Sequence, residues 1–218
     1  MRAVWLGIVV AGCGSGGTAS GGLPHPEVVG EHGGISVREI GARDGMVYAR
    51  IVNDTGDSGL LFRVRLDSYD PRGEELGSTE NLCRTVTGGT TVVGGAEAHC
   101  LWHGVGDDIA SVEVGFVGAD PVADYAPLGL FGVVGDPTYT DAGSSFGTVE
   151  AELCQNDHIE SPTLHQRTDL DVIVLDDHGL PWDEGGITDL QVTDADPCVT
   201  GTVGGLEMPE NPRIIATP

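Results

Sequence analysis

Apolar and polar residues alternate along much of this chain. Residues 46–53 read MVYARIVN and residues 60–69 read LLFRVRLDSY, and in both segments apolar side chains fall at about every second position. A period of two is that of a β-strand with one buried face. Residues 35–40 fit the same pattern after a slip of one position, and no stretch of ten residues has a clear amphipathic helical period. The pattern therefore predicts an all-β protein.

Turn signals separate these apolar segments. Residues 70–73 read DPRG, in which Pro71 has the backbone angle of the first central turn position and Gly73 closes the turn. Similar clusters of Gly, Pro and Asp recur every eight to twelve residues or so, a spacing typical of β-sandwiches of the immunoglobulin type.

Segments of the second half of the chain resemble segments of the first. Residues 147–156 echo 45–54, residues 169–179 echo 64–73, and the stretch from Cys198 echoes the stretch from Cys100. The offsets are all close to about 100 residues, the size of one immunoglobulin-like sandwich. We therefore expect two tandem modules, and the alternative is one large sandwich.

The repeats also suggest where the modules begin and end. The first module is expected at residues 35–118 and the second at 138–218. Residues 119–137 would hold the linker and a first strand. The first module resembles the small immunoglobulin-like surface domains called FxLYC, in residues 45–53 and 69–77. This resemblance implies a domain of lipid-anchored or secreted archaeal and bacterial proteins, without catalytic residues.

The N-terminal segment has the layout of a secretory signal. Residues 1–13 read MRAVWLGIVVAGC, with one Arg, an apolar run too short to span a bilayer, and small residues before Cys13. Residues 10–13 resemble the lipobox of lipoprotein signal peptides. This resemblance implies that residues 1–12 are removed, that Cys13 carries lipid, and that the protein is anchored to the outer face of the membrane. The Gly/Ser-rich start of residues 13–34 then predicts a flexible tether; the alternative is a core strand with an incidental Cys.

The charge is strongly one-sided. The chain has 34 Asp and Glu against 10 basic residues, all of them Arg, which gives a net charge of −24. Such a surface repels nucleic acid, so a nucleic-acid partner is not expected. The Lys-free, acid-rich composition resembles that of halophilic archaeal proteins, and we expect salt to stabilise the fold. A thermal melt that is flat from low to molar salt would argue against this. The alternatives are a secreted protein of a high-GC bacterium and an acidic surface for Ca²⁺ or a basic partner.

The cysteine count fits an oxidising compartment. With Cys13 assigned to lipid, four cysteines remain, and of the three possible connectivities we favour Cys83–Cys100 with Cys154–Cys198. Each bridge would contribute roughly 2–4 kcal/mol of stability. A metal site at His99, Cys100 and His103 is the competing interpretation. On a strand the two imidazoles share one face and Cys100 points to the other, so we predict neither a metal site nor a cofactor.

Three further motifs suggest other functions. Residues 143–147 match the G-x-S-x-G pattern of serine hydrolases around Ser145, but a strand pattern follows where a hydrolase needs a helix. Acidic residues crowd 169–196 without the spacing of an EF-hand, which favours a solvated surface over a Ca²⁺ site. Asn53 begins an Asn-Asp-Thr sequence, an acceptor pattern for glycosylation, at a predicted strand end.

Together these patterns predict a lipid-anchored protein of the cell envelope with a binding or scaffolding role and no catalytic site. Its partners would be the membrane, through the lipid, and a surface protein or glycan. Two alternatives stay open: a secreted or surface hydrolase that uses Ser145, and a Ca²⁺-dependent adhesion module.

Overall fold

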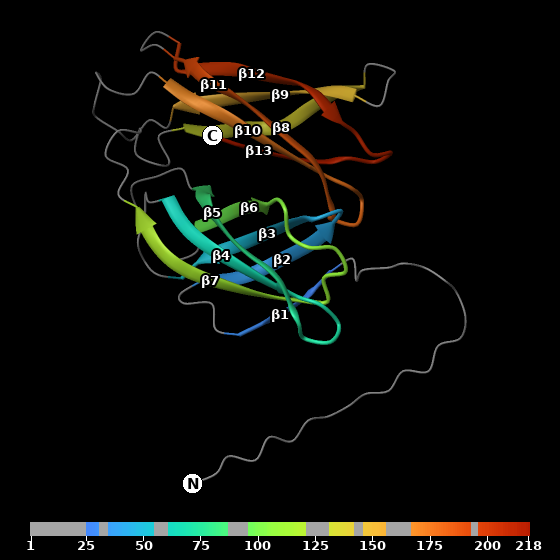
Figure 1. The fold of residues 1–218 in the computed structure, drawn as a ribbon. Coiled ribbons are helices and arrows are strands. Elements are labelled where there is room, and N and C mark those ends of the chain that lie inside the picture. Colours follow the sequence, from blue (N-terminus) through green and yellow to red (C-terminus); the bar gives the residue numbers. More distant parts are fainter. Residues whose placement is uncertain are drawn as a thin grey trace.

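A computed structural model describes eight segments of the chain: residues 25–30, 35–54, 61–86, 96–120, 131–141, 146–155, 167–192 and 196–218. They contain thirteen β-strands and no helix, which confirms the predicted all-β fold (Figure 1). It follows that no helix in these segments is long and apolar enough to cross a bilayer.

The first seven strands form the lower half of Figure 1: β1 (Glu27–Val29), β2 (Ile35–Arg43), β3 (Met46–Asn53), β4 (Leu61–Tyr69), β5 (Glu75–Val86), β6 (Ala96–Trp102) and β7 (Ser111–Asp120). They are hydrogen-bonded in the order β1-β7-β4-β5-β6-β3-β2. Strand β5 pairs with β4 over most of its length and with β6 only from Arg84 to Val86. The sheet therefore bends at β5 into two layers, β7-β4-β5 and β2-β3-β6, which enclose one core.

The alternation in the sequence accounts for this core. Val47, Ala49 and Ile51 on β3 and Val64 and Leu66 on β4 are buried at 0–1% exposure and belong to one apolar cluster. Strand β2 has a β-bulge between Val37 and Glu39, at the slip predicted from its pattern.

The other six strands form a second sandwich: β8 (Phe131–Asp141), β9 (Phe146–Gln155), β10 (Arg167–Leu175), β11 (Pro181–Gln191), β12 (Cys198–Glu207) and β13 (Arg213–Thr217). They make two three-stranded sheets, β12-β9-β8 and β11-β10-β13. Val149, Ala151 and Leu153 on β9 pack with Leu170 and Val172 on β10 in a separate core.

The two sandwiches repeat one strand order. The sheet β8-β9-β12 corresponds to β2-β3-β6, and β13-β10-β11 corresponds to β7-β4-β5. The turns that follow β4 and β10 are also the same. Asp70 Oδ1 accepts the backbone N–H groups of residues 72 and 74, and Asp176 Oδ1 accepts those of residues 178 and 180. The chain thus holds two tandem sandwiches, and β1, parallel to β7, is an addition to the first.

The strand pairing corrects one detail of the predicted repeat. Ala49 pairs with Cys100, and its counterpart Ala151 pairs with Gly201, so Cys100 corresponds to Gly201 and not to Cys198. The two cysteines lie on equivalent strands, but Cys198 begins β12 whereas Cys100 is the fifth residue of β6, so the true register differs from the predicted one by three residues. The strands also begin early: β1 lies within residues 13–34, and β8 begins within 119–137.

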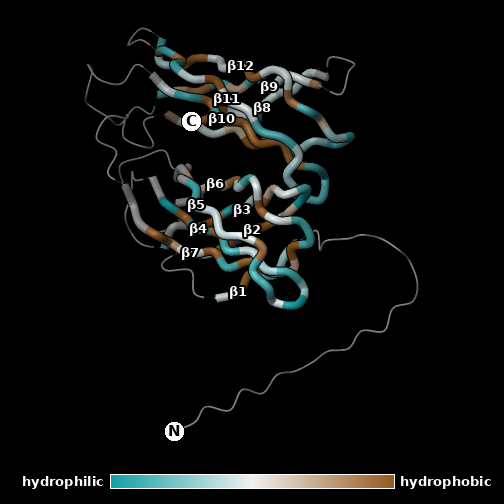
Figure 2. The backbone as a smooth tube through the Cα atoms, in the orientation of Figure 1, coloured by the Kyte–Doolittle hydropathy of each residue, from teal (hydrophilic) through white to brown (hydrophobic). Residues whose placement is uncertain are grey.

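The two sandwiches stack face to face. The outer face of β2-β3-β6 packs against the outer face of β10-β11-β13, so that the protein has four layers of strands (Figures 1 and 2). We call the contact between these two faces the junction.

Candidate functional site

The centre of the junction is apolar. Tyr48 on β3 and Leu101 on β6 contact Ile173 and Leu175 on β10, and Ile215 on β13 packs against them. Tyr48 and Leu175 have no exposed surface at all. Each of these residues lies on the strand face opposite its own core, because neighbouring residues in a strand point to opposite sides. The same alternation that builds each core therefore also supplies the apolar centre of the junction.

Two glycines bring the backbones of the two sandwiches together. A Cβ atom on Gly41 of β2 would lie 2.5 Å from the carbonyl oxygen of Gly179, which follows β10. Gly179 itself has a φ of +79°, a backbone conformation that side chains with a Cβ rarely adopt. Glycine at both positions allows the backbone of β2 to contact the turn after β10, and a larger residue at either position would force the two backbones apart.

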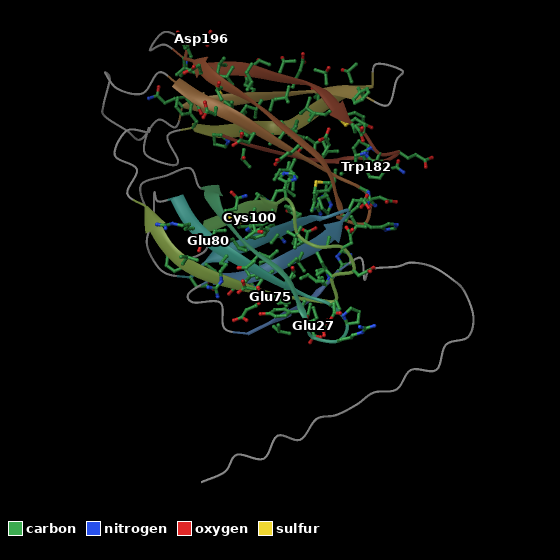
Figure 3. All side chains as sticks on the ribbon, viewed as in Figure 1. Glu27, Glu75, Glu80, Cys100, Trp182 and Asp196 are labelled. Carbon is green, nitrogen blue, oxygen red and sulfur yellow. A yellow bond between two sulfur atoms is a disulfide. The ribbon has the colours of Figure 1, made fainter. Side chains whose placement is uncertain are left out.

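Charged side chains surround this centre. Arg43 forms an ion pair with Asp176, and its guanidinium lies 4.5 Å from the ring centroid of Trp182, which Figure 3 labels at the junction. Glu39 accepts from Arg213 at 2.6 Å, so a second ion pair also joins the two sandwiches. A chain with only ten Arg places three of them, Arg43, Arg50 and Arg213, in this small region.

The carboxylate of Asp176 is held in its charged form. Burial alone would raise its pKa, but the N–H groups of Leu180 and His178 and the guanidinium of Arg43 outweigh burial and lower it. Since Asp176 both closes the turn after β10 and pairs with Arg43, the turn and the junction depend on one side chain.

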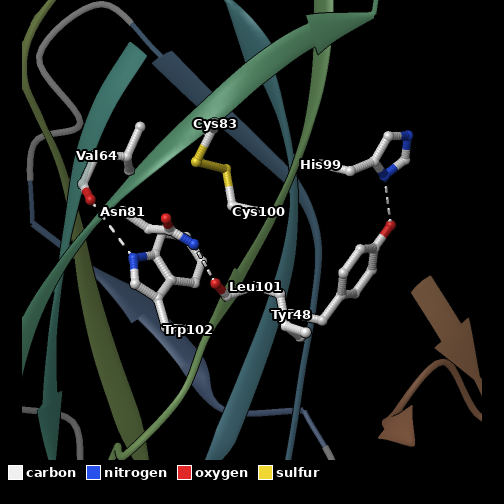
Figure 4. The surroundings of a disulfide bond; sticks show 8 residues. All are labelled: Tyr48, Val64, Asn81, Cys83, His99, Cys100, Leu101 and Trp102. Atoms are coloured by element: carbon white, nitrogen blue, oxygen red, sulfur yellow. Dashed lines mark hydrogen bonds between the residues drawn. A yellow bond between two sulfur atoms is a disulfide. The ribbon is translucent and has the colours of Figure 1, made fainter. Parts of the chain in front are cut away.

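Tyr48 and His99 form a hydrogen-bonded pair at the junction (Figure 4). The Tyr48 Oη lies 2.8 Å from His99 Nδ1, and the two rings are stacked. Burial lowers the pKa of His99 to about 4, with Arg50 and Arg213 adding to this effect while Glu97 and Glu39 oppose it. Burial and Glu39 also raise the pKa of Tyr48 above its usual value. The pair is therefore neutral at neutral pH.

The first disulfide lies in the core of the first sandwich. It joins Cys83 on β5 to Cys100 on β6, where β5 leaves β6 and passes to the other layer (Figure 4). Both cysteines are buried, at 0% and 1% exposure, and belong to the same apolar cluster as Trp102. The indole Nε1 of Trp102 donates to the backbone oxygen of Val64, 3.4 Å away on the opposite layer. Disulfide and indole together connect the two layers.

The second disulfide lies on an outer surface. Cys154 on β9 and Cys198 on β12 are directly paired, with Cα atoms 4.0 Å apart, so this bridge links two strands of one sheet. Leu153 points into the core, and Cys154 therefore points away from it. Both bridges join the pairs that the sequence favoured.

The other predicted sites lie apart. His99 is hydrogen-bonded to Tyr48, Cys100 is in a disulfide, and His103 is hydrogen-bonded to Glu184 across the junction. The three residues therefore do not form one metal site. Cys13 and Ser145 lie outside the described residues. The strand β9 begins one residue after Ser145, where a hydrolase would have a helix. Asn53 ends β3, and its side chain is outside the description.

The acidic residues of the second half serve several separate backbone contacts. Asp183 accepts the N–H groups of Glu184 and Glu207, and Asp169 accepts that of Asp189. In Figure 3, Glu75 and Glu80 lie on the first sandwich and Asp196 at the far end of the second. Among the described residues, one group brings three metal-ligating atoms within 4.8 Å of one another, and it is Glu152 with Cys154 and Cys198.

Sequence reasoning did not single out the Tyr48–His99 pair, the junction residues or Glu152. In the alternating pattern, Tyr48 and Leu101 fall on the strand face that points away from the core. A single sequence does not show which of these outward faces another part of the chain will cover. Glu152 had one signal, its place two residues before Cys154 on the same strand face.

The comparisons with known proteins assign no relative. No protein family matches this chain, and no curated protein matches it.

Proposed function

We propose that this chain is a lipid-anchored, non-catalytic protein of the cell envelope, with a binding or scaffolding role. The observation that carries the proposal is the junction. An apolar centre with two residues of zero exposure, surrounded by ion pairs, holds the two sandwiches in one orientation. Inter-domain contacts that are small and polar usually permit relative motion, whereas a buried apolar centre closed by ion pairs opposes it. A fixed four-layer body suits a protein that presents its two outer faces to partners in one fixed arrangement.

The compartment is inferred from chemistry. Disulfides form and persist outside the reducing cytosol, and all four cysteines after Cys13 are paired. The segment that ends at Cys13 supports secretion and lipidation. Because a single acyl chain binds a membrane only marginally, stable anchoring requires at least two chains on Cys13.

The partner is expected to be a surface protein or a glycan. The two outer faces of the stack, on β7-β4-β5 and on β8-β9-β12, carry mainly charged and hydroxyl side chains, with Val117, Val134 and Phe146 as exposed apolar residues among them. Faces of this kind favour polar recognition with hydrogen bonds over burial of an apolar surface.

The test is a comparison of the intact chain with two variants in the native membrane. We expect the wild-type protein in the membrane fraction, with an N-terminal peptide that starts at Cys13 and carries the mass of a lipid. Cys13→Ser should leave the peptide unmodified and release the protein from the membrane, because the thiol that accepts lipid is lost. Ser20→Ala, in the same stretch, should behave like the wild type.

A non-reducing peptide map of the same samples completes the test. We expect Cys83 linked to Cys100 and Cys154 linked to Cys198. An unmodified N-terminus together with free thiols would contradict the proposal, because it would place the protein in a reducing compartment without an anchor.

A further inference from the structure

The surface disulfide lies beside a carboxylate. Glu152, Cys154 and Cys198 share the outer face of β9-β12, and one ligand atom from each lies within 4.8 Å of the others. Glu152 is exposed and the two cysteines are half-buried. Two sulfurs and a carboxylate are a donor set that Zn²⁺ accepts, at distances of about 2.3 Å to sulfur and about 2.0–2.2 Å to oxygen.

The two disulfides differ in access to a reductant. Thiol–disulfide exchange requires a thiolate to reach one of the sulfurs. Cys83 and Cys100 are at most 1% exposed within an apolar core, whereas Cys154 and Cys198 lie on the outer face of a sheet. A reductant should therefore open the surface bridge first and leave the core bridge intact.

We propose that Glu152, Cys154 and Cys198 form a binding site for Zn²⁺ or a similar thiophilic divalent cation when the surface disulfide is reduced by a dithiol. In the first step the dithiol becomes a disulfide, and its two electrons and two protons convert the Cys154–Cys198 bond into two thiols. In the second step the cation binds both thiolates and the Glu152 carboxylate, and the two thiol protons are released. Exchange with a small disulfide, which takes up the two electrons and becomes two thiols, re-forms the Cys154–Cys198 bond, removes two ligands and frees the cation.

The strands already hold the ligands in place. Cys154 and Cys198 are a directly paired position with Cα atoms 4.0 Å apart, and Glu152 lies two residues along β9 on the same face. Two thiolates on one tetrahedral cation stand about 3.8 Å apart, a separation that two side chains at such a position can provide. Three protein ligands leave the fourth position of a tetrahedral cation for water. The inference does not depend on the lipid anchor.

The experiment uses the full chain and Co²⁺, whose complexes with thiolates have a charge-transfer absorption. We expect the oxidised protein to show no such band, and the protein treated with a dithiol, then freed of it under anaerobic conditions, to bind one equivalent. Zn²⁺ should displace the Co²⁺ and remove the band. Peptide mapping should show the Cys83–Cys100 bridge intact in the same sample.

Two variants test the role of the carboxylate. Glu152→Gln should weaken Co²⁺ binding by about tenfold or more, since it removes one ligand. Glu150→Gln is the matched control, because it removes the same charge from an exposed position two residues away on the same face. It should change the affinity by less than about twofold, because it contributes only through long-range charge.

Several results would overturn the inference. One is the absence of a stoichiometric Co²⁺-thiolate band in reduced protein. Equal effects of Glu152→Gln and Glu150→Gln would refute the carboxylate ligand. Loss of the strand signal in circular dichroism on reduction would refute the site itself, since it requires that β9 stay paired with β12. A band that persists in the Cys154→Ser, Cys198→Ser double variant would place the bound metal elsewhere.

Discussion

The two sandwiches share a strand order and a turn, but their equivalent outer faces carry different chemistry. Tyr48 pairs with Leu101 on the first sandwich, and the equivalent pair on the second is Glu150 with Thr202. The first pair is buried in the junction and the second is exposed. The two faces have the same strand order, so their side chains distinguish the covered face from the exposed one.

On the other sheet of each sandwich the difference is reversed: the face on β10-β11-β13 of the second sandwich is covered, and the equivalent face on β4-β5-β7 of the first is not. Ile173 and Leu175 of the second sandwich are buried in the junction, whereas the equivalent residues of the first, Asp67 and Tyr69, lie on a face with Arg65 and Glu113. A third sandwich added at this end would have to remove these charged groups, including the Arg65–Asp67 ion pair, from water, which is costly. The comparison thus explains why the stack has one junction and two polar ends.

The largest expected effect concerns the two cores. Trp102→Ala should lower the free energy of unfolding by about 3–5 kcal/mol, because it leaves a large cavity beside the buried disulfide. Its counterpart is Val203, a much smaller buried residue, and Val203→Ala should lower it by only about 2 kcal/mol. Urea unfolding of both variants measures the difference. Equal losses would mean that the first core does not depend on its indole.

The junction gives the next largest effect. Leu175→Ala should cost about 2–4 kcal/mol and separate a single calorimetric transition into two, because it removes a fully buried contact between the sandwiches. Tyr69→Ala changes the equivalent residue on the free face of the first sandwich. It should cost about 1 kcal/mol or less and leave the transition single. A transition that stays single in Leu175→Ala would show that the coupling of the two halves does not depend on this contact.

These comparisons also show how far the sequence could predict the fold. The period of two in residues 46–53 and 60–69 predicts both faces of each strand, and the turn at Asp70 recurs at Asp176. The two disulfides followed from their number and position. The junction could not be predicted from the sequence. Tyr48 and Leu101 differ from other outward-facing residues only because the second sandwich covers them. The predicted alignment of Cys198 with Cys100 was wrong, because a short sequence similarity is a weaker guide to equivalent positions than strand pairing.

The equivalent turn residues separate the contribution of the turn from that of the junction. Asp70→Ala should cost about 1 kcal/mol, the value of a capping side chain at an exposed turn. Asp176→Ala should cost about 2–3 kcal/mol, because it also leaves Arg43 without its partner at the junction. Unfolding free energies at pH 7 measure both.

The pH dependence of the Asp176 effect has a definite sign. The folded-state pKa of Asp176 is lowered, so its contribution is complete above about pH 4, the unfolded value, and is lost as the pH falls through the folded pKa. The difference between wild type and Asp176→Ala should therefore shrink in acid. A difference that stays constant down to pH 2 would contradict the role assigned to the charge.

The last prediction concerns the pH dependence of stability. It compares an ionisable residue at the junction with an equivalent residue that cannot ionise. His99 corresponds to Thr200 on the free face, and its folded-state pKa of about 4 lies below the usual 6.5. Unfolded chains therefore bind a proton at His99 that the folded protein does not bind, and stability should fall as the pH drops from about 6.5 towards 4. Between pH 7 and pH 5 the loss due to His99 should be about 1–2 kcal/mol. His99→Gln should remove this slope, whereas His178→Gln, whose side chain is 72% exposed, should retain it. If both variants kept the slope, protonation of His99 would not be what weakens the junction, and the Tyr48–His99 hydrogen bond would have only a positioning role.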